Sequence, residues 1–196
     1  MHRRIARVSL RSCGRGWKQA RALSSGVSWN DTPADVEWNE WGPAVRVRVD
    51  HAPVALFARA VKDTSPVYRS ENAARDAGFV QVPVPPTFTF VMADSGTFPD
   101  LQPPGGTGSM YAGSGLDAGS AFARDGLYLH GEQHFTYHRP VGVGDVLEGR
   151  MRTSKPVART ARRGPMEVTW FQTRWTDVDG TPVVDEQIVS LFFPNT

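Results

Sequence analysis

The chain has 196 residues, of which 40% are hydrophobic and 10% aromatic, and its 22 basic and 20 acidic residues give a formal net charge of +2. This length predicts one domain with a single hydrophobic core. No run approaches the roughly 18 uncharged apolar residues that a membrane-spanning helix needs, so we expect no membrane span. Cys13 is the single cysteine, which excludes a disulfide framework or a thiolate metal site within one chain.

Residues 1–26 differ in charge from the rest of the chain. They contain seven basic residues, no acidic residue precedes Asp31, and serine is frequent. A basic, serine-rich segment without acidic residues is typical of a mitochondrial transit peptide. Two other interpretations stay open, namely a disordered basic tail and an upstream extension misread as coding.

Removal of this segment would reverse the net charge of the protein. The seven basic residues would leave with it, so 22 − 7 = 15 basic residues would remain against 20 acidic ones, a formal net charge of −5. Nucleic-acid binding needs a basic face on the folded domain and therefore loses its main support. We predict a mitochondrial matrix protein in which residues 27–196 form a single domain.

A strand and two helices are the first elements predicted after this segment. In AVRVRVD, residues 44–50, valines alternate with charged residues, which is the pattern of a strand with one buried face. Apolar residues then recur at helical spacing and predict a helix over residues 51–62. The stretch ENAARDAGF, residues 71–79, predicts a second, short helix that ends at Gly78.

An apolar helix is the predicted centre of the fold. The stretch VPVPPTFTFVMADSGTF, residues 82–98, opens on prolines that fit a helix start and continues almost wholly apolar. A helix that is apolar on every side must be wrapped by the rest of the protein. Residues 99–124 are rich in glycine but have neither Walker nor GxGxxG spacing, so we predict a plain loop there.

Four strands are predicted in the C-terminal part of the chain. They cover roughly residues 127–138, 146–154, 166–177 and 181–193. Asp179 and Gly180 form the turn between the last two strands, which predicts an antiparallel hairpin. One buried helix followed by a run of antiparallel strands indicates an α+β domain.

Four stretches of the sequence carry a resemblance to a known family. They are, in order, DTSPVY, VPPTFTF, LHGEQHFTYHRPVGVGD and TDVDGTPVVDEQIVSLFF. Together they resemble the MaoC-like hydratase and dehydratase branch of the hot-dog fold, and more narrowly its dehydratase-like N-terminal domain, over roughly residues 43–193. The resemblance implies a hot-dog fold, in which an antiparallel sheet wraps around one central apolar helix.

The same resemblance implies reversible hydration of a 2-enoyl thioester of coenzyme A or acyl carrier protein. The reverse reaction needs a base for the C2 proton, an acid for the departing hydroxyl and donors to the enolate-like oxygen. In active members an Asp-x-x-Pro-x-His motif shares the proton work, and backbone N–H groups at the start of the central helix bind the thioester oxygen. We therefore expect substrate, without a cofactor, at the matching helix start, which is formed by Pro85, Pro86, Thr87 and Phe88.

The family motif is incomplete in this chain. Asp63 and Pro66 fit it, but Tyr68 takes the place of the histidine. An unperturbed tyrosine has a pKa of about 10 and a histidine of about 6.5, so at neutral pH tyrosine is not a ready base. Asp63 keeps two interpretations, a residual catalytic residue or a turn or cap residue ahead of serine and proline.

Three histidines are candidates to replace the missing one. His130, His134 and His138 would share one face of an unbroken strand, where His130 or His138 would serve as a compensating acid or base. Otherwise each is an ordinary surface or hydrogen-bonded histidine. Their spacing also matches a helical metal pair, but the surrounding FTY favours a strand and no acidic cluster supplies further ligands, so we predict no metal site.

A small basic cluster is expected in a loop between two strands, and its members are Arg159, Arg162 and Arg163. The cluster is either a solvated loop or a contact for the phosphates of coenzyme A or for an acidic carrier protein. No GxSxG motif is present, so thioester hydrolysis by a serine nucleophile is unsupported.

These features predict the histidine-lacking subunit of a 3-hydroxyacyl-thioester dehydratase, or 2-enoyl-thioester hydratase. Such a subunit would form a homo- or heterodimer with another hot-dog domain and contribute acyl-chain binding, while a catalytic partner supplies the aspartate and histidine. One alternative is a self-sufficient dehydratase that uses Asp63 with a non-standard acid or base. The other is a non-catalytic acyl-thioester-binding or scaffold protein.

Overall fold

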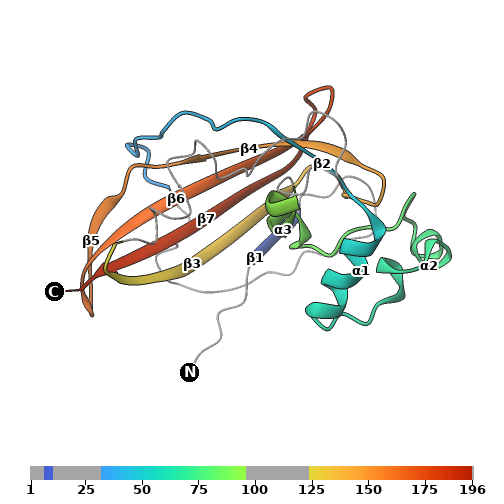
Figure 1. Ribbon diagram of the computed structural model, residues 1–196, viewed down its shortest axis with the longest axis horizontal. Coiled ribbons are helices and arrows are strands. Elements are labelled where there is room, and N and C mark those ends of the chain that lie inside the picture. The colour runs from blue at the N-terminus through green and yellow to red at the C-terminus, as the bar shows by residue number, and fades with distance from the viewer. Residues whose placement is uncertain (1–6, 11–31, 96–123, 196) are drawn as a thin grey trace.

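One sheet and a few short helices make up the part of the chain that the computed structural model describes, residues 7–10, 32–95 and 124–195 (Figure 1). In chain order the elements are β1 (Arg7–Leu10), β2 (Val45–Arg48), α1 (His51–Ala60), the 3₁₀ helix η1 (Pro66–Tyr68), α2 (Glu71–Asp76), α3 (Phe88–Ser95), β3 (Gly126–Tyr137), β4 (Val146–Thr153), β5 (Val157–Ala161), β6 (Gly164–Asp177) and β7 (Pro182–Pro194). The remainder of the predicted transit peptide and the glycine-rich stretch up to residue 123 lie outside the described residues.

The seven strands form one sheet in the order β1-β3-β7-β6-β4-β2, and β5 pairs with β6 beside this path. The ladders between β3, β7, β6, β4 and β2 are antiparallel, whereas the short β1 pairs with β3 in parallel. Gly180 lies in the turn between β6 and β7 with φ of +87°, a conformation that favours glycine. The predicted hairpin and the antiparallel α+β class are confirmed.

The two predicted helices before the apolar one are also confirmed. α1 buries Val54 and Ala58 on one side. α2 begins after Ser70, whose hydroxyl accepts a hydrogen bond from the Ala73 N–H at 3.3 Å and so satisfies one of the free donors of the first turn. Both helices lie together at one end of the sheet (Figure 1).

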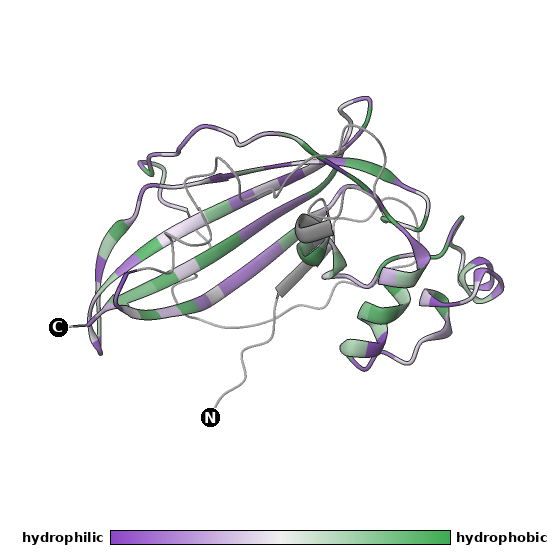
Figure 2. Ribbon diagram, viewed as in Figure 1, coloured by the Kyte–Doolittle hydropathy of each residue, from purple (hydrophilic) through white to green (hydrophobic). Residues whose placement is uncertain are grey.

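Successive side chains on each strand point to opposite faces of the sheet, and Figure 2 shows the resulting alternation of hydrophobic and hydrophilic residues. The main core lies on the face that carries α3, where Phe88 and Met92 pack with Phe135 and Trp175. A smaller apolar cluster on other strand positions is built around Trp170 and is covered in part by residues that precede β2. The sheet is therefore apolar on the α3 side and mixed on the other.

α3 begins at Phe88 rather than at the prolines, because the Phe88 N–H donates to the Pro85 carbonyl at 2.9 Å in the turn before the helix. Phe88 and Met92 are buried in the core, with 3% and 0% of their surface exposed. Phe90 and Val91 are half-buried. Both nevertheless pack against the main core, so the predicted central apolar helix is confirmed.

The basic cluster does not lie wholly in a loop as predicted. Arg159 is on β5, which forms a hairpin with β6, and Arg162 and Arg163 occupy the turn between the two strands. The pattern was hidden because this edge strand is largely exposed and lacks the apolar alternation of a half-buried strand.

Candidate functional site

The Asp63 turn connects α1 to η1 and is held by its own backbone. The Asp63 N–H donates to the Ala58 carbonyl at 2.8 Å, and Lys62 just before it has a positive φ of 60°. The Asp63 carboxylate accepts a hydrogen bond from the Ser65 N–H at 2.9 Å, which is the geometry of an Asx turn. Pro66 then starts η1. Asp63 therefore acts as a turn residue, and its side chain is half-buried.

Tyr68 is the last residue of η1 and packs against the main core. Its pKa is raised, first by burial and then by the nearby negative charge of Asp63. Because the shift moves the pKa further above neutral pH, the phenol stays protonated and can donate a hydrogen bond but cannot accept a proton as a base. The structure thus brings Asp63 and Tyr68 together without a basic group between them.

The start of α3 is fixed by a tyrosine that the motif search did not single out. The Tyr137 hydroxyl, at the end of β3, donates a hydrogen bond to the Pro86 carbonyl. Burial is the main reason that the pKa of Tyr137 is raised. Pro85 is buried, Thr87 is half-buried and Pro86 is exposed, so the helix start faces the surface at one point only.

The HRPVGVGD stretch supports the segment that leads into α3. Arg139 makes ion pairs with Asp145, at 2.7 Å, and with Asp177. Asp145 in turn accepts hydrogen bonds from the Gly142 N–H at 3.0 Å and from the Gln81 side chain at 2.8 Å. These contacts tie residues 139–145 to the strand-like segment before the helix, so this most specific part of the resemblance is structural.

Glu186 is a buried carboxyl group near the same helix. It lies on β7, only 4% exposed, and burial raises its pKa from an ordinary value of 4.5 to about 7. The Thr89 hydroxyl and the Trp175 indole N–H adjoin it and lower this pKa in part. Sequence reasoning missed this residue, although its signal was an acid at an inward position of the strand, between Val184 and Ile188.

The three histidines do not share a face, because β3 is not unbroken. A bulge between His130 and Glu132 shifts the register against β7. His130 lies on the α3 side, where its ring meets Phe90 edge-on at 6.1 Å, and partial burial lowers its pKa. His134 is on the opposite side of the sheet, since it alternates with the core residue Phe135.

His138 also lies away from the start of α3. Its Nε2 atom is 2.8 Å from the Asp185 carboxylate, which binds Arg174 at 3.0 Å as well. Asp185 precedes the inward-facing Glu186 and so belongs to the opposite face. The structure therefore separates His138 from Asp63 and Tyr68 by the sheet, and Arg159 lies on β5, at the end of the sheet far from α1 (Figure 1).

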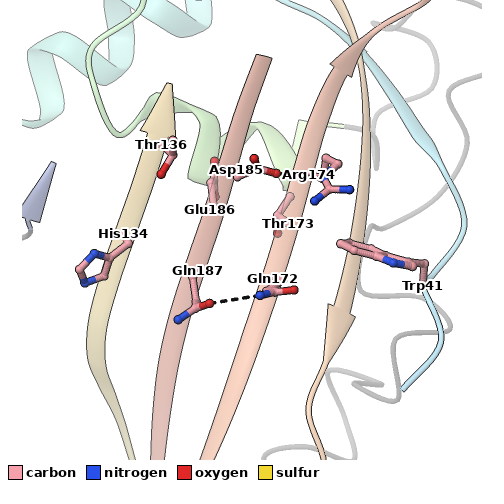
Figure 3. Close-up of a pocket in the computed structure, with 9 residues that line it drawn as sticks. All are labelled: Trp41, His134, Thr136, Gln172, Thr173, Arg174, Asp185, Glu186 and Gln187. Carbon is pink, nitrogen blue, oxygen red and sulfur yellow. Dashed lines mark hydrogen bonds and ion pairs between the residues drawn. The ribbon is translucent and has the colours of Figure 1, made fainter. Parts of the chain in front are cut away.

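A pocket opens along the middle strands, and Figure 3 shows its lining on β3, β7 and β6, with Trp41 at one side. Its residues are Trp41, His134, Thr136, Gln172, Thr173, Arg174, Asp185, Glu186 and Gln187. Most of these side chains alternate with core residues, so the pocket lies on the face opposite α3. Arg152 stacks between Trp38 and Trp41, at 4.4 and 4.6 Å from the ring centroids, and so holds the N-terminal arm to this face.

Neither a metal site nor a membrane helix is found in the part of the chain that the structure describes. No three histidine, cysteine, aspartate or glutamate side chains there come together to hold a metal ion. No helix among those residues is long and apolar enough to cross a bilayer.

Comparison with known families places the sequence in a dehydratase context. The model of a family described as "FAS1-like, dehydratase domain region" matches residues 39–186. A UPF0336 protein of Saccharopolyspora erythraea is 31% identical over 144 residues, which are 74% of this chain and 80% of that protein. A UPF0336 protein of Clavibacter michiganensis is 36% identical over 131 residues, 67% of this chain and 75% of that protein.

Solved structures show the same fold. The HadBC (3R-hydroxyacyl-ACP dehydratase) complex of Mycobacterium tuberculosis is matched with a TM-score of 0.58 at 24% identity, over 80% of this chain and 97% of that one. The ChsH1–ChsH2 complex of the same organism is matched with a TM-score of 0.58 at 18% identity, over 80% and 85%. The hot-dog fold and the MaoC-like resemblance inferred from the sequence are confirmed.

Proposed function

Since the chain belongs to the FAS1-like dehydratase family, we propose that it is the histidine-lacking subunit of a 3-hydroxyacyl-thioester dehydratase and pairs with a catalytic hot-dog domain. One observation carries the proposal. Tyr68 occupies the position of the catalytic histidine, packs against the core and has a raised pKa, so the chain has a family frame without its proton-transferring group.

The neighbours with a similar fold support the paired arrangement. Both are described as complexes of two differently named components, and one of them as a 3R-hydroxyacyl-ACP dehydratase. A subunit of this kind would bind part of the acyl thioester at the start of α3, where the chain turns through Pro85 and Pro86. Its partner would supply the base for the C2 proton and the acid for the departing hydroxyl. We place this work in the mitochondrial matrix on the basis of the N-terminal segment.

His130 gives the second candidate a specific basis. It lies on the same side of the sheet as α3, against Phe90, and its lowered pKa keeps it neutral at physiological pH. A neutral imidazole is able to accept a proton. A self-sufficient dehydratase would combine His130 with Asp63, and only activity of the chain alone would favour that candidate.

Purification and reconstitution test the proposal. The endogenous chain is isolated, co-purifying proteins are identified, and hydration of crotonyl-coenzyme A is measured for the chain alone, the partner alone and the two together. We expect a co-purifying hot-dog protein with an Asp-x-x-Pro-x-His motif and little activity from the chain alone. Tyr68→Phe, which keeps the ring but removes the hydroxyl, should leave the activity of the pair unchanged.

Two outcomes would contradict this assignment in different ways. Full activity of the chain alone, lost in His130→Gln, would move the chemistry to the second candidate. Thioester binding without any partner or any activity would instead indicate a binding protein, the third interpretation of the sequence.

A further inference from the structure

A group of polar side chains is buried where α3 crosses the sheet. Glu186 comes from β7, Trp175 from β6, Tyr137 from β3 and Thr89 from α3 itself. Val184 pairs with both Trp175 and Tyr137, two residues before Glu186, so the three strand residues are close neighbours on the α3 face. Thr89 and Trp175 are 0% exposed and Glu186 is 4% exposed.

Three atoms of this group lack a well-formed hydrogen bond to any described residue. They are Thr89 Oγ1, Trp175 Nε1 and Glu186 Oε1. The hydroxyl and the indole N–H nevertheless lie close enough to the Glu186 carboxyl to affect its pKa. A buried polar atom without a partner is unfavourable, so the convergence of three such atoms at one point calls for a role that apolar residues could not fill.

That role is to fix the position of α3 on the sheet. The side chains by which the helix meets the core are mainly apolar, and hydrophobic contact has no direction, so it does not by itself fix how far the helix slides or turns. Polar contacts are directional and do so. Tyr137 holds the Pro86 carbonyl just before the helix, and Glu186 faces Thr89 in its first turn. The two contacts come from the neighbouring strands β3 and β7.

We propose that Glu186 is a positioning residue that fixes the N-terminal end of α3, and that it does so as a neutral carboxylic acid. The inference rests on the proposed function, in which this end of the helix binds the thioester. The neutral acid donates one hydrogen bond to the Thr89 hydroxyl and accepts one from the Trp175 N–H, which satisfies all three buried atoms.

Ionisation of Glu186 disturbs its arrangement with Thr89 and Trp175. Burial places the pKa of Glu186 at about 7, so the group changes charge near neutral pH. The titratable group that faces it is Tyr137, which stays a neutral phenol because burial raises its pKa, and α3 and β6 present the uncharged Thr89 and Trp175. A carboxylate there can still accept hydrogen bonds from the Thr89 hydroxyl and the Trp175 N–H, but no positive charge faces it among the described residues. A buried charge without a facing positive charge is unfavourable, so the helix start shifts from its fixed position to let water reach the group.

Binding of crotonyl-coenzyme A tests the inference on the full chain, in complex with any partner that co-purifies. Affinity is measured between about pH 5.5 and 8.5, the range over which such a group ionises. Wild-type affinity should fall about tenfold as pH rises through 7, which corresponds to a loss of about 1.4 kcal/mol of binding free energy. Glu186→Gln should bind as the wild type does at low pH and show no such fall.

Two further variants complete the set. Glu186→Leu, which leaves Thr89 and Trp175 without a partner, should bind weakly at every pH. Asp185→Asn changes the adjacent carboxylate on the opposite face and should follow the wild-type profile.

The outcomes distinguish failure of the inference about Glu186 from failure of the proposed function. If wild-type protein binds the thioester but Glu186→Gln keeps the full pH dependence, Glu186 does not position the helix. A folded Glu186→Leu variant with wild-type affinity at low pH would overturn the inference as well. If wild-type protein, with or without its partner, binds no thioester at any pH, the proposed function itself fails and this inference falls with it.

Discussion

Tyr68 lies half-buried at the end of η1, beside Asp63 and against the core that holds α3. In the proposed site, the missing element is therefore a group that titrates near neutral pH. Glu186 is such a group, but it is buried beside Thr89, where we propose that it positions the helix. The proposed proton-transfer position is thus held by a phenol whose pKa is raised, and the proposed positioning residue is a carboxyl group whose pKa lies near 7.

Tyr68→His restores the family motif in one step. A general acid–base group contributes typically ~10²–10⁴-fold to rate, so hydration of crotonyl-coenzyme A by the isolated chain should rise by up to this factor. The loss of absorbance of the enoyl thioester measures it. The gain should disappear again in Tyr68→His combined with Asp63→Asn. A variant that binds the thioester but stays inactive would show that the donors at the start of α3 are misplaced as well.

Glu186 makes the stability of the fold depend on pH in a definite direction. Its pKa is about 7 in the folded protein against an ordinary 4.5, so between these values the folded state holds a proton that the unfolded state has released. The free energy of unfolding should therefore fall as pH rises from 4.5 to about 7, by about 3 kcal/mol, relative to Glu186→Gln. Urea unfolding at a series of pH values measures the difference, and equal slopes for the two proteins would contradict it.

At the scale of the elements, the periodicity of apolar residues predicts elements that have one buried face and misses an element that is largely exposed. The strand β2 and the helix α1 were predicted because apolar side chains recur along them at a fixed spacing, and α2 was predicted from the glycine that ends it. The exposed edge strand β5 has no such pattern, and the bulge beside His130 is set by pairing with β7 rather than by local sequence.

The candidate site was likewise predicted only in part from the sequence. Asp63 and Tyr68 were found because they belong to a motif that is contiguous in sequence. Tyr137 and Glu186 were missed because their role arises from two strands and a helix that only the fold brings together. An alternating pattern does not show which side of a strand faces the helix when the strand is apolar on both sides, as at Val183 and Val184.

α3 offers a direct test of which of its sides is buried. Met92→Asp places a charge at a 0% exposed position in the core and should cost about 3–5 kcal/mol of unfolding free energy. Phe90→Asp changes a half-buried residue and should cost about 1–2 kcal/mol. Met92→Leu, of similar volume, is the matched control and should cost less than about 1.5 kcal/mol. Equal losses in the two aspartate variants would indicate that both sides of the helix are buried.

At the scale of the whole molecule, the two faces of the sheet differ in the residues that they carry. The α3 face holds the core, Tyr68 and the start of the helix, whereas the opposite face carries polar side chains and the N-terminal arm, which is held by Arg152 between Trp38 and Trp41.

The charge of residues 1–26 leads to a prediction about the mature chain. We expect the protein isolated from mitochondria to begin after about residue 24, because the basic, acid-free segment before it has the composition of a transit peptide. Mass spectrometry of the endogenous N-terminus measures this, and recovery of the intact segment 1–26 would contradict it. A chain that starts at Val27 should unfold within a few degrees of the full-length protein, since the part of the described structure that it loses is the four-residue parallel strand β1 beside β3. A much larger drop would mean that β1 is part of the folded domain, and a transit peptide would then be the wrong interpretation of this segment.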